Sequence, residues 1–344
     1  MELINISEYE ALAKQRMASA FWDYYQGGSN DEVSLRANRT AFEDIRLRPR
    51  VLMGTNTCDL HTTVLGTSVS MPILVAPTAQ HGLAHPDGEC ATARGAEMAH
   101  TLMTVSTQSS YSIEDIARVG KALCWFQFYI YKDLHISESL LRRAEAAGYR
   151  AVVLTVDTPR IGRREKDIRN GFEIPPHIRF GNFPQNIDKS VLEEYAALNW
   201  DILSWIRTIT SLPIILKGIL TAEDAKLAIE HGVAGIIVSN HGGRRLDGSV
   251  ATIEALPEII DVVAGRCEVY LDGGIRRGTD ALKALALGAR AVLVGRPILW
   301  GLAVKGAEGV RHVLELLRSE LELAMILAGQ SDLESIDRSL VKIK

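Results

Sequence analysis

The sequence predicts a (β/α)₈ barrel, in which eight parallel strands alternate with eight helices. Short apolar runs rich in β-branched residues recur along the chain, and helix-like stretches separate most of them. The eight runs are residues 72–76, 102–106, 123–129, 151–157, 213–217, 235–239, 268–272 and 291–295. Continuous apolar runs are typical of strands buried on both faces of a parallel sheet. An open doubly wound sheet is the alternative, but no G-x-G-x-x-G follows the first run, which disfavours it.

Helix boundaries are indicated by capping residues between the runs. A Ser or Thr at the start and a Gly at the end are typical of a helix in an α/β unit. The boundaries predicted in this way are Ser112 (with Asp115 as its capping-box partner) to Gly120, Ser137 to Gly148, Thr221 to Gly232, and Thr279 to Gly288.

Two segments fall outside the strand–helix alternation. Residues 1–70 carry an amphipathic helix over 6–17, and we expect them to form an N-terminal cap on a barrel of residues 71–344, all within one domain. Residues 158–200 separate the fourth and fifth strands and are too long for an ordinary βα loop. Segments of that length are usually functional, so we expect a lid.

Composition narrows the class of protein. The 344 residues carry a net charge of −4, which predicts no electrostatic attraction to nucleic acid or to an anionic membrane. No run approaches the ~20 apolar residues that span a bilayer, and no signal-peptide core is present. The four cysteines are scattered and lack metal-ligand spacing, so we expect no metal site and small buried thiols in a reducing, cytoplasmic compartment.

Polar residues collect where the predicted strands end, which is where barrels of this kind place their active sites. Glycines and arginines after the last two strands favour a phosphate site over plain turns, since barrels cradle phosphate there. Lys217, at the end of the fifth strand, is compatible with a structural ion pair, a Schiff-base amine or a cation facing an electron-rich cofactor.

The stretch after the sixth strand, VSNHGGRRLDG, is the most specific. His241 precedes two glycines, which allow a ligand close to the backbone, and Arg244 can clamp a carboxylate in bidentate fashion. An imidazole beside such a clamp is what abstraction of a proton next to a carboxylate requires. Asp157 is a candidate to orient that imidazole.

With these motifs the chain resembles the FMN-dependent α-hydroxy-acid oxidases and dehydrogenases, the family of glycolate oxidase and lactate oxidase. The resemblance runs over essentially the whole chain. The motifs that carry it, in order, are Thr155-Val-Asp-Thr-Pro159, Gly162-Arg-Arg164, Ser239-Asn-His-Gly-Gly-Arg244 with Leu246-Asp247, Leu271-Asp-Gly-Gly274 and Gly295-Arg-Pro297.

The resemblance implies a role for each matching residue. It makes His241 the catalytic base with Asp157 as its partner, and it makes Arg164, Arg244, Tyr24 and Tyr129 substrate-binding residues. It places Lys217 near flavin N1. The other implied FMN contacts are Ser106, Gln127, Thr155, Ser239 and the Pro77, Thr78 and Ala79 backbone at the ring, and Asp272, Gly273, Gly274, Arg276, Gly295 and Arg296 at the ribityl chain and phosphate.

Two departures bear on the substrate. Gln108 stands where glycolate oxidase has a tryptophan that lines the substrate side-chain pocket, which favours a larger acid than glycolate. Arg245 replaces the usual glutamine after the arginine clamp, and the sequence offers no physical account of it.

The resemblance predicts oxidation of (S)-2-hydroxy acids, L-lactate or a longer acid, to 2-oxo acids with reduction of O₂ to H₂O₂. The alternative is a dehydrogenase that passes electrons to a quinone or a protein carrier. An FMN-dependent isomerase or a barrel that only binds a phosphate ligand would not need the Arg164/Arg244 clamp. The family also implies a homotetramer.

Overall fold

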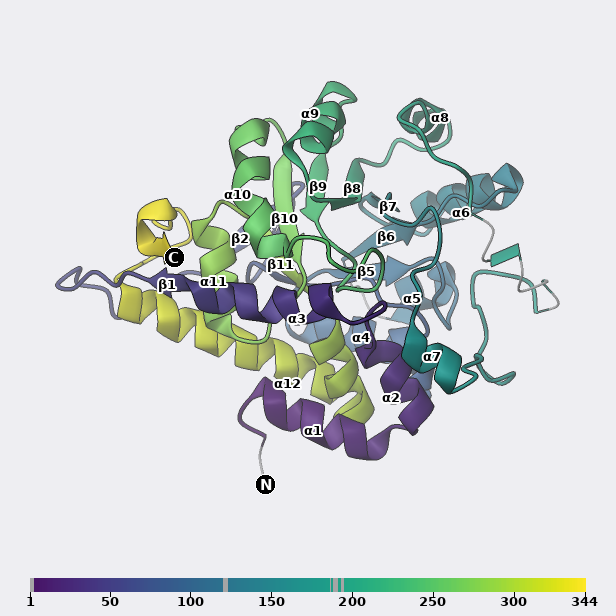
Figure 1. Ribbon diagram of the computed structural model, residues 1–344, viewed down its shortest axis with the longest axis horizontal. Helices are drawn as coiled ribbons and strands as arrows, with labels where there is room; N and C mark the ends of the chain where they lie inside the picture. The colour runs from purple at the N-terminus through teal and green to yellow at the C-terminus, as the bar shows by residue number, and fades with distance from the viewer. Residues whose placement is uncertain (1–2, 120–122, 186, 188–190, 193–194) are drawn as a thin grey trace.

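Eight parallel strands close a barrel at the centre of the molecule, in the computed structural model that describes residues 3–119, 123–185, 187, 191–192 and 195–344 (Figure 1). The strands are β4 (Ile73–Val75), β5 (Met103–Ser106), β6 (Cys124–Phe128), β7 (Val152–Thr155), β8 (Ile214–Ile219), β9 (Gly235–Val238), β10 (Glu268–Asp272) and β11 (Ala291–Val294). They neighbour one another in chain order, and β11 pairs with β4 to complete the ring. Each predicted run forms one of these strands, so the fold class is confirmed.

A helix follows every barrel strand and packs outside the ring (Figure 1). These helices are α4 (Gly88–Met98), α5 (Ile113–Val119), α6 (Leu134–Ala146), α8 (Ile202–Arg207), α9 (Ala222–Glu230), α10 (Thr252–Val263), α11 (Gly278–Ala286) and α12 (Arg296–Ala328). The Thr221 side chain caps α9 and the Ser112 hydroxyl accepts from Asp115 N, as predicted, whereas the predicted helix end at Gly120 lies outside the described residues.

Two predicted helix starts are wrong. Helix α6 begins at Leu134 because the Asp133 side chain accepts from His135 N and caps the helix one turn earlier than Ser137. The Ser137 hydroxyl instead accepts from Tyr131 N, which holds the end of the preceding loop. Helix α11 begins at Gly278, one residue before Thr279, with the Asp280 carboxylate accepting from the backbone at its start.

The barrel interior is packed at the end where the strands begin and open at the end where they finish. Leu74, Val153, Ile215, Ile237 and Leu293 are among the inward side chains that form one apolar cluster. A hairpin of β2 (Thr62–Val64) and β3 (Thr67–Val69) adds its valines to the same cluster. The hairpin covers the lower mouth of the barrel, which is the end where the strands begin. Its Leu65 N donates to the carboxylate of Glu268, the first residue of β10. The polar pocket of the described barrel lies at the opposite, upper mouth.

The N-terminal segment folds against the barrel. It contains α1 (Ile6–Arg16), α2 (Ser19–Gln26), α3 (Val33–Thr40), the 3₁₀ helix η1 (Ala41–Asp44) and β1 (Ile45–Leu47), which pairs with β12 (Val341–Ile343) after the 3₁₀ helix η4 (Arg338–Leu340). Figure 1 shows α1 beside α12 and α3 across the same side of the molecule. Asn38 of α3 exchanges two hydrogen bonds with Asn240, each 2.8 Å long, which fixes α3 to the loop after β9.

The described residues of the connection between β7 and β8, the segment expected to be a lid, have little regular structure and reach the upper mouth of the barrel. They include α7 (Glu165–Arg169), and Tyr195 forms an isolated bridge with Tyr131. The 3₁₀ helix η2 (His81–Leu83) lies in the loop after β4. In the described part of the chain, no helix combines the length and apolarity needed to cross a membrane.

Candidate active site

A deep pocket opens at the carboxyl ends of the barrel strands and contains about 1160 Å³ free of protein atoms, including its open mouth. Its lining combines strand ends, the N-terminal segment and the lid. The lining residues are Tyr24, Tyr25, Ala76, Pro77, Thr78, Ala79, Ser106, Gln108, Gln127, Tyr129, Thr155, Ile161, Arg164, Tyr195, Lys217, His241, Gly242, Arg244, Arg245, Asp272, Gly273, Gly274, Ile275, Arg276, Leu293, Val294, Gly295, Arg296 and Leu299.

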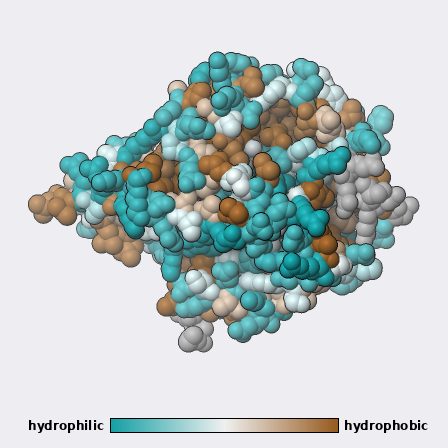
Figure 2. All heavy atoms as spheres, in the orientation of Figure 1, coloured by the Kyte–Doolittle hydropathy of each residue, from teal (hydrophilic) through white to brown (hydrophobic). Residues whose placement is uncertain are grey.

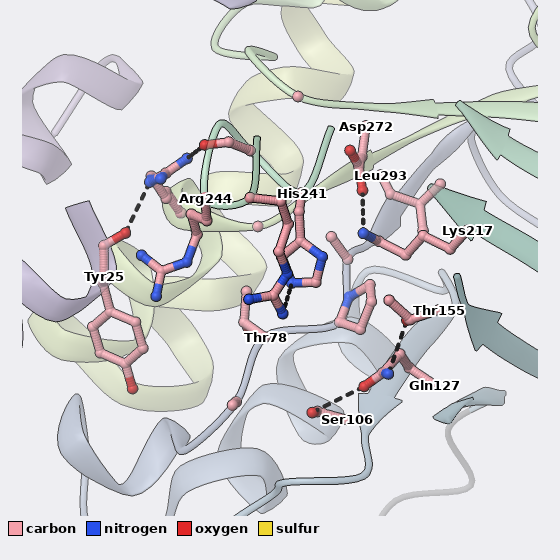
Figure 3. Close-up of a pocket in the computed structure, with 18 of the residues that line it drawn as sticks. Tyr25, Thr78, Ser106, Gln127, Thr155, Lys217, His241, Arg244, Asp272 and Leu293 are labelled. Atoms are coloured by element: carbon pink, nitrogen blue, oxygen red, sulfur yellow. Dashed lines mark hydrogen bonds and ion pairs between the residues drawn. The ribbon is translucent and has the colours of Figure 1, made fainter. Parts of the chain in front are cut away.

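One wall of the pocket is a row of hydrogen-bonded polar side chains on adjacent strands (Figure 3). The Ser106 hydroxyl donates to Gln127 Oε1 at 3.1 Å, and Gln127 Nε2 donates to Thr155 Oγ1 at 2.9 Å. These residues end β5, lie near the end of β6 and end β7, so the parallel register places them side by side. The row presents donors and acceptors along one edge of a flat ligand.

Lys217 is the buried cation of the pocket floor. Its Nζ donates to Ser239 Oγ at 2.9 Å and lies 3.3 Å from Asp272 Oδ2 (Figure 3). Burial disfavours the ammonium charge, but Asp272 and then Asp157 outweigh burial and raise the pKa of Lys217. A permanently charged lysine thus faces the pocket.

His241 and Asp157 form a buried pair. His241 Nδ1 lies 3.0 Å from Asp157 Oδ1, and their side chains are only 19% and 12% exposed. Gly218 makes room for the carboxylate: it bulges β8 against β9 with φ of +114°, and a Cβ there would come within 2.7 Å of Asp157 Cβ. Burial, then Arg245, lowers the pKa of His241 to about 3, so the ring is neutral at pH 7.

Arg164 and Arg244 converge on Tyr24. Both guanidinium carbons lie 5.3 Å from the centre of the Tyr24 ring, a cation–π arrangement. Arg164 comes from the lid and pairs with Asp167 at 3.0 Å, whereas Arg244 Nη1 donates to the Tyr24 carbonyl at 2.7 Å. Gly162 permits this meeting, because a Cβ there would lie 2.4 Å from the Arg244 carbonyl oxygen. Burial lowers the pKa of Arg244 to about 10, and the nearby charge of Arg164 adds to this effect, as expected where two cations lie close together.

Two more arginines line the pocket after β10 and β11, and one of them, Arg296, donates to the Gly27 carbonyl that Arg244 also bonds. Arg276 stacks on Trp300, with its guanidinium carbon 4.7 Å from the ring centre, and Arg296 opens α12. Neither arginine forms an ion pair within the described residues. Burial lowers the pKa of Arg276 to about 10 and that of Arg296 to about 9, and the charges of neighbouring arginines add to this effect. Gly274 lines the pocket at φ of +84° and packs so closely against α3 that a Cβ there would clash with the Asn38 carbonyl.

The residues present fit FMN. The unpaired arginines and the start of α12 suit its phosphate, and the hydrogen-bonded row and Lys217 suit the polar edge of its ring. Asp272 Oδ1 is a buried acceptor with no partner in the described part of the chain, which suits a hydroxyl of the ribityl chain. No group of His, Cys, Asp or Glu that could hold a metal occurs among the described residues.

The pocket collects all but two of the residues predicted from the sequence. Asp157 lies behind His241, as a partner of the base would, and is not itself lining. Ser239 is fully buried, and its Oγ accepts from Lys217 Nζ and from His241 N instead of lining the pocket.

Other lining residues were not predicted. Tyr195 and Ile161 arrive from the lid, Tyr25 arrives from α2, and Arg245 turns inward beside its predicted neighbour. For Arg245 the sequence did carry a signal, the departure from the usual glutamine. No pattern marked Tyr195, because its place depends on the path of an irregular segment.

Fold and site together define a flavin-binding (β/α)₈ enzyme of 2-hydroxy acids. Residues 13–343 match the model of the FMN-dependent dehydrogenase family. The chain is 50% identical to glycolate oxidase of Spinacia oleracea over 352 residues (98% of this chain, 95% of that one), and 51% identical to glycolate oxidase 3 of Oryza sativa subsp. indica over 355 residues (99% and 97%). A solved structure of mandelate oxidase superposes with a TM-score of 0.94 at 45% identity, covering 100% of this chain and 99% of that one.

The chain therefore belongs to the FMN-dependent dehydrogenase family. It is an FMN-dependent hydroxy-acid oxidase, as the resemblance predicted.

Proposed function

We propose that the enzyme oxidises (S)-2-hydroxy acids, L-lactate or a longer acid, to 2-oxo acids and reduces O₂ to H₂O₂. The observation that carries this proposal is the clamp of Arg164 and Arg244 on Tyr24, in the same pocket as the His241–Asp157 pair. A carboxylate site beside a neutral imidazole suits removal of a proton from a group next to the carboxylate.

In this proposal the substrate carboxylate binds Arg164 and Arg244, whose planar guanidinium groups match a carboxylate in bidentate fashion. Tyr24 supports both arginines from below and fixes their orientation. Tyr129 lines the same pocket, and its hydroxyl, which accepts from Arg245 Nη2, would bind the C2 substituent. These contacts select the acid and aim its C2 hydroxyl at His241.

His241 then accepts the hydroxyl proton on Nε2, while the C2 hydrogen leaves with its bonding electron pair and the C2–O bond becomes a carbonyl. The Nδ1 atom faces Asp157 and supplies it with an N–H, which leaves the Nε2 lone pair on the pocket side, where Arg245 Nη2 lies 3.3 Å away. Burial opposes ionisation of Asp157, but His241 and then Lys217 hold its pKa below the ordinary value. The carboxylate is therefore charged and stabilises the imidazolium that forms.

Bound FMN supplies the two-electron acceptor. The ribityl chain and phosphate would lie on Asp272, Gly273, Gly274, Arg276, Gly295 and Arg296, and the ring would lie on Pro77, Thr78 and Ala79 with its polar edge at Ser106, Gln127 and Thr155. Lys217 would face ring N1, and its raised pKa keeps a positive charge where the reduced ring carries negative charge. Ser239 would act through Lys217 rather than touch the ring.

The substrate side chain would meet a polar wall. Gln108 Nε2 donates to the Tyr195 hydroxyl at 3.1 Å and to the Leu192 carbonyl at 3.2 Å, which ties the wall to the lid. Gln108 is smaller than the tryptophan of glycolate oxidase, and this favours lactate or a longer acid over glycolate. The relatives named above act as glycolate and mandelate oxidases, so both small and aromatic acids belong in the test.

The test is a panel of glycolate, L-lactate, D-lactate, 2-hydroxyoctanoate and (S)-mandelate. Anaerobic bleaching of the flavin identifies the acids that reduce the enzyme, and peroxide release in air identifies O₂ as the acceptor. We expect L-lactate or 2-hydroxyoctanoate to give the highest kcat/KM, with one H₂O₂ per turnover. Reduced enzyme that persists in air would instead favour the quinone or protein-carrier dehydrogenase.

We also propose a homotetramer in the cytoplasm. An apolar projection on the loop after β1, formed by Val51, Leu52 and Met53, packs near Gly329 at the end of α12, a helix that also exposes Leu323 and Leu327. Figure 2 shows hydrophobic atoms gathered at this end of the molecule. Exposed apolar patches of this kind support contact with another subunit.

Four free thiols support the proposed cytoplasmic location, because that compartment is reducing.

A further inference from the structure

Arg245 is placed differently from the other arginines of the pocket. Its Nη2 lies 3.3 Å from His241 Nε2 and 3.4 Å from the Tyr129 hydroxyl. Its Nε is buried and has no partner in the described part of the chain. No carboxylate of the described residues pairs with it, whereas Arg164 pairs with Asp167. Arg245 therefore presents Nη2 to His241 and Tyr129 with no carboxylate to neutralise its charge in the described part of the chain.

The contact with His241 fixes which ring nitrogen carries the proton. A guanidinium has only donors, so Nε2 must accept in this contact and Nδ1 must carry the N–H that Asp157 receives. Arg245 and Asp157 thus act on opposite edges of the same ring. The guanidinium also opposes a positive charge on the imidazole, in addition to the effect of burial.

The same contact shows where the substrate oxygen must lie. A general base takes a proton from an atom within about 2.6–3.2 Å, so the C2 hydroxyl has to approach His241 Nε2. Arg245 Nη2 and the Tyr129 hydroxyl lie at that position, so the C2 oxygen replaces His241 Nε2 as the acceptor of the Arg245 N–H when it gives its own proton to Nε2. An oxygen that binds there meets the N–H groups of Arg245.

We propose that Arg245 is a third substrate-binding arginine, which donates to the oxygen on C2 while Arg164 and Arg244 hold the carboxylate. This assignment rests on the proposed function. The oxygen becomes more negative as its proton passes to His241, and it remains an acceptor when it becomes the carbonyl of the 2-oxo acid. A glutamine at position 245 offers a neutral amide, so the charge-assisted bond is a property of this chain.

The contact predicts that affinity depends on the C2 oxygen. Pyruvate and propionate both carry a carboxylate and a methyl group, but only pyruvate has an oxygen on C2. Hydrogen bonds to charged groups contribute about 1.5–3 kcal/mol, which is roughly a 10- to 100-fold change in Kd. Arg245→Gln should therefore raise the Kd of pyruvate by about tenfold or more and that of propionate by less than about threefold.

The experiment is calorimetric titration of oxidised holoenzyme with each acid, for wild type, Arg245→Gln and Arg245→Lys. Arg163→Gln is the matched control, because Arg163 lies in the lid near the clamp but its side chain is 67% exposed. Lysine keeps the charge and should recover part of the pyruvate affinity. The kcat/KM for L-lactate should fall in Arg245→Gln in parallel with pyruvate affinity.

Equal weakening of both acids, or no change in either, would overturn the contact and leave the proposed function standing. The binding measurements need no turnover. A wild-type enzyme that binds pyruvate through Arg245 but oxidises no 2-hydroxy acid would instead count against the proposed function alone. Retention of FMN by Arg245→Gln shows that the variant is folded.

Discussion

His241 Nδ1 lies 3.0 Å from Asp157 Oδ1, and the bulge at Gly218 is what lets the carboxylate reach it. The two nitrogens of the His241 ring therefore have different roles. Nδ1 is hydrogen-bonded to Asp157, and Nε2 lies on the pocket side, where it can accept a proton.

Replacement of His241 by glutamine should stop substrate oxidation without loss of FMN, because His241 accepts the proton and the hydrogen bonds of Arg276 and Arg296 do not involve its side chain. Positioned proton transfer contributes about 10²–10⁴-fold to rate, so anaerobic flavin bleaching by L-lactate should slow at least 100-fold, roughly. His61→Gln is the control, since His61 is 72% exposed. Bleaching of the His241 variant at the wild-type rate would remove His241 from its role.

Asp157→Asn should keep the geometry but remove the negative charge beside the ring. Asp157 raises the pKa of His241, so its loss should make the imidazolium harder to form and lower kcat by about 100-fold or more. KM for L-lactate should change little, because the Arg164/Arg244 clamp is separate. Steady-state kcat and KM measure the split, and a rise in KM with unchanged kcat would contradict it.

Glu89 makes stability depend on pH. It is fully buried, Oε1 accepts from His81 N and Ser110 N, and burial raises its pKa to about 7. Between the ordinary pKa of 4.5 and about 7, the unfolded chain loses this proton while the folded chain keeps it. The folded state binds more protons in that window, so stability from this group falls as pH rises, by up to about 1.4 kcal/mol per unit.

Denaturant unfolding of Glu89→Gln at pH 5, 6 and 7 tests this dependence. The variant should lack the decline, so its free energy of unfolding should gain on the wild type as pH rises. Glu308→Gln, at a 60% exposed side chain, should follow the wild type. Parallel curves for Glu89→Gln and wild type would show that Glu89 ionises normally.

Gln108→Trp should narrow the side-chain pocket. The ratio of kcat/KM for 2-hydroxyoctanoate to that for glycolate should fall about tenfold or more, since one poorly accommodated methylene alone costs about 1–3 kcal/mol. Gln108→Leu is the control, because it removes the amide bonds to Leu192 and Tyr195 without adding the bulk of an indole. If the kcat/KM ratio falls equally in both variants, the cause is loss of the Gln108 hydrogen bonds to the lid rather than the volume of the new side chain.

Leu52→Asp should dissociate the proposed tetramer, because Leu52 is fully exposed at the centre of the apolar projection. Sedimentation or light scattering gives the mass, and Ile4→Asp, at another exposed apolar residue, should remain assembled. If wild type is already monomeric, the assembly proposal is wrong.

The barrel and the strand-end residues could be predicted because both follow from local signals. A buried parallel strand needs a continuous apolar run, and once eight such runs are found, topology alone brings Lys217, His241 and Asp272 to one mouth. Helix starts were less certain, since Asp133 and Ser137 are both capping residues and only packing selects one.

What could not be predicted depends on irregular backbone. Tyr195 reaches the pocket through a lid with no periodicity, and Ser239 turns behind Lys217 because a residue that follows a strand can face either way. The inward direction of Arg245 depends on the turn that precedes it.

That turn has a thermodynamic consequence. His241, Gly242 and Gly243 are successive residues with φ of 57°, 64° and 74°, and the first of them has a side chain in a region that suits glycine. A left-handed residue other than glycine costs about 1–2 kcal/mol, although histidine tolerates it better than most. Stability and catalysis therefore make opposite demands on position 241. Selection for thermal stability alone would favour glycine there, and selection for catalysis retains a histidine despite its strained backbone.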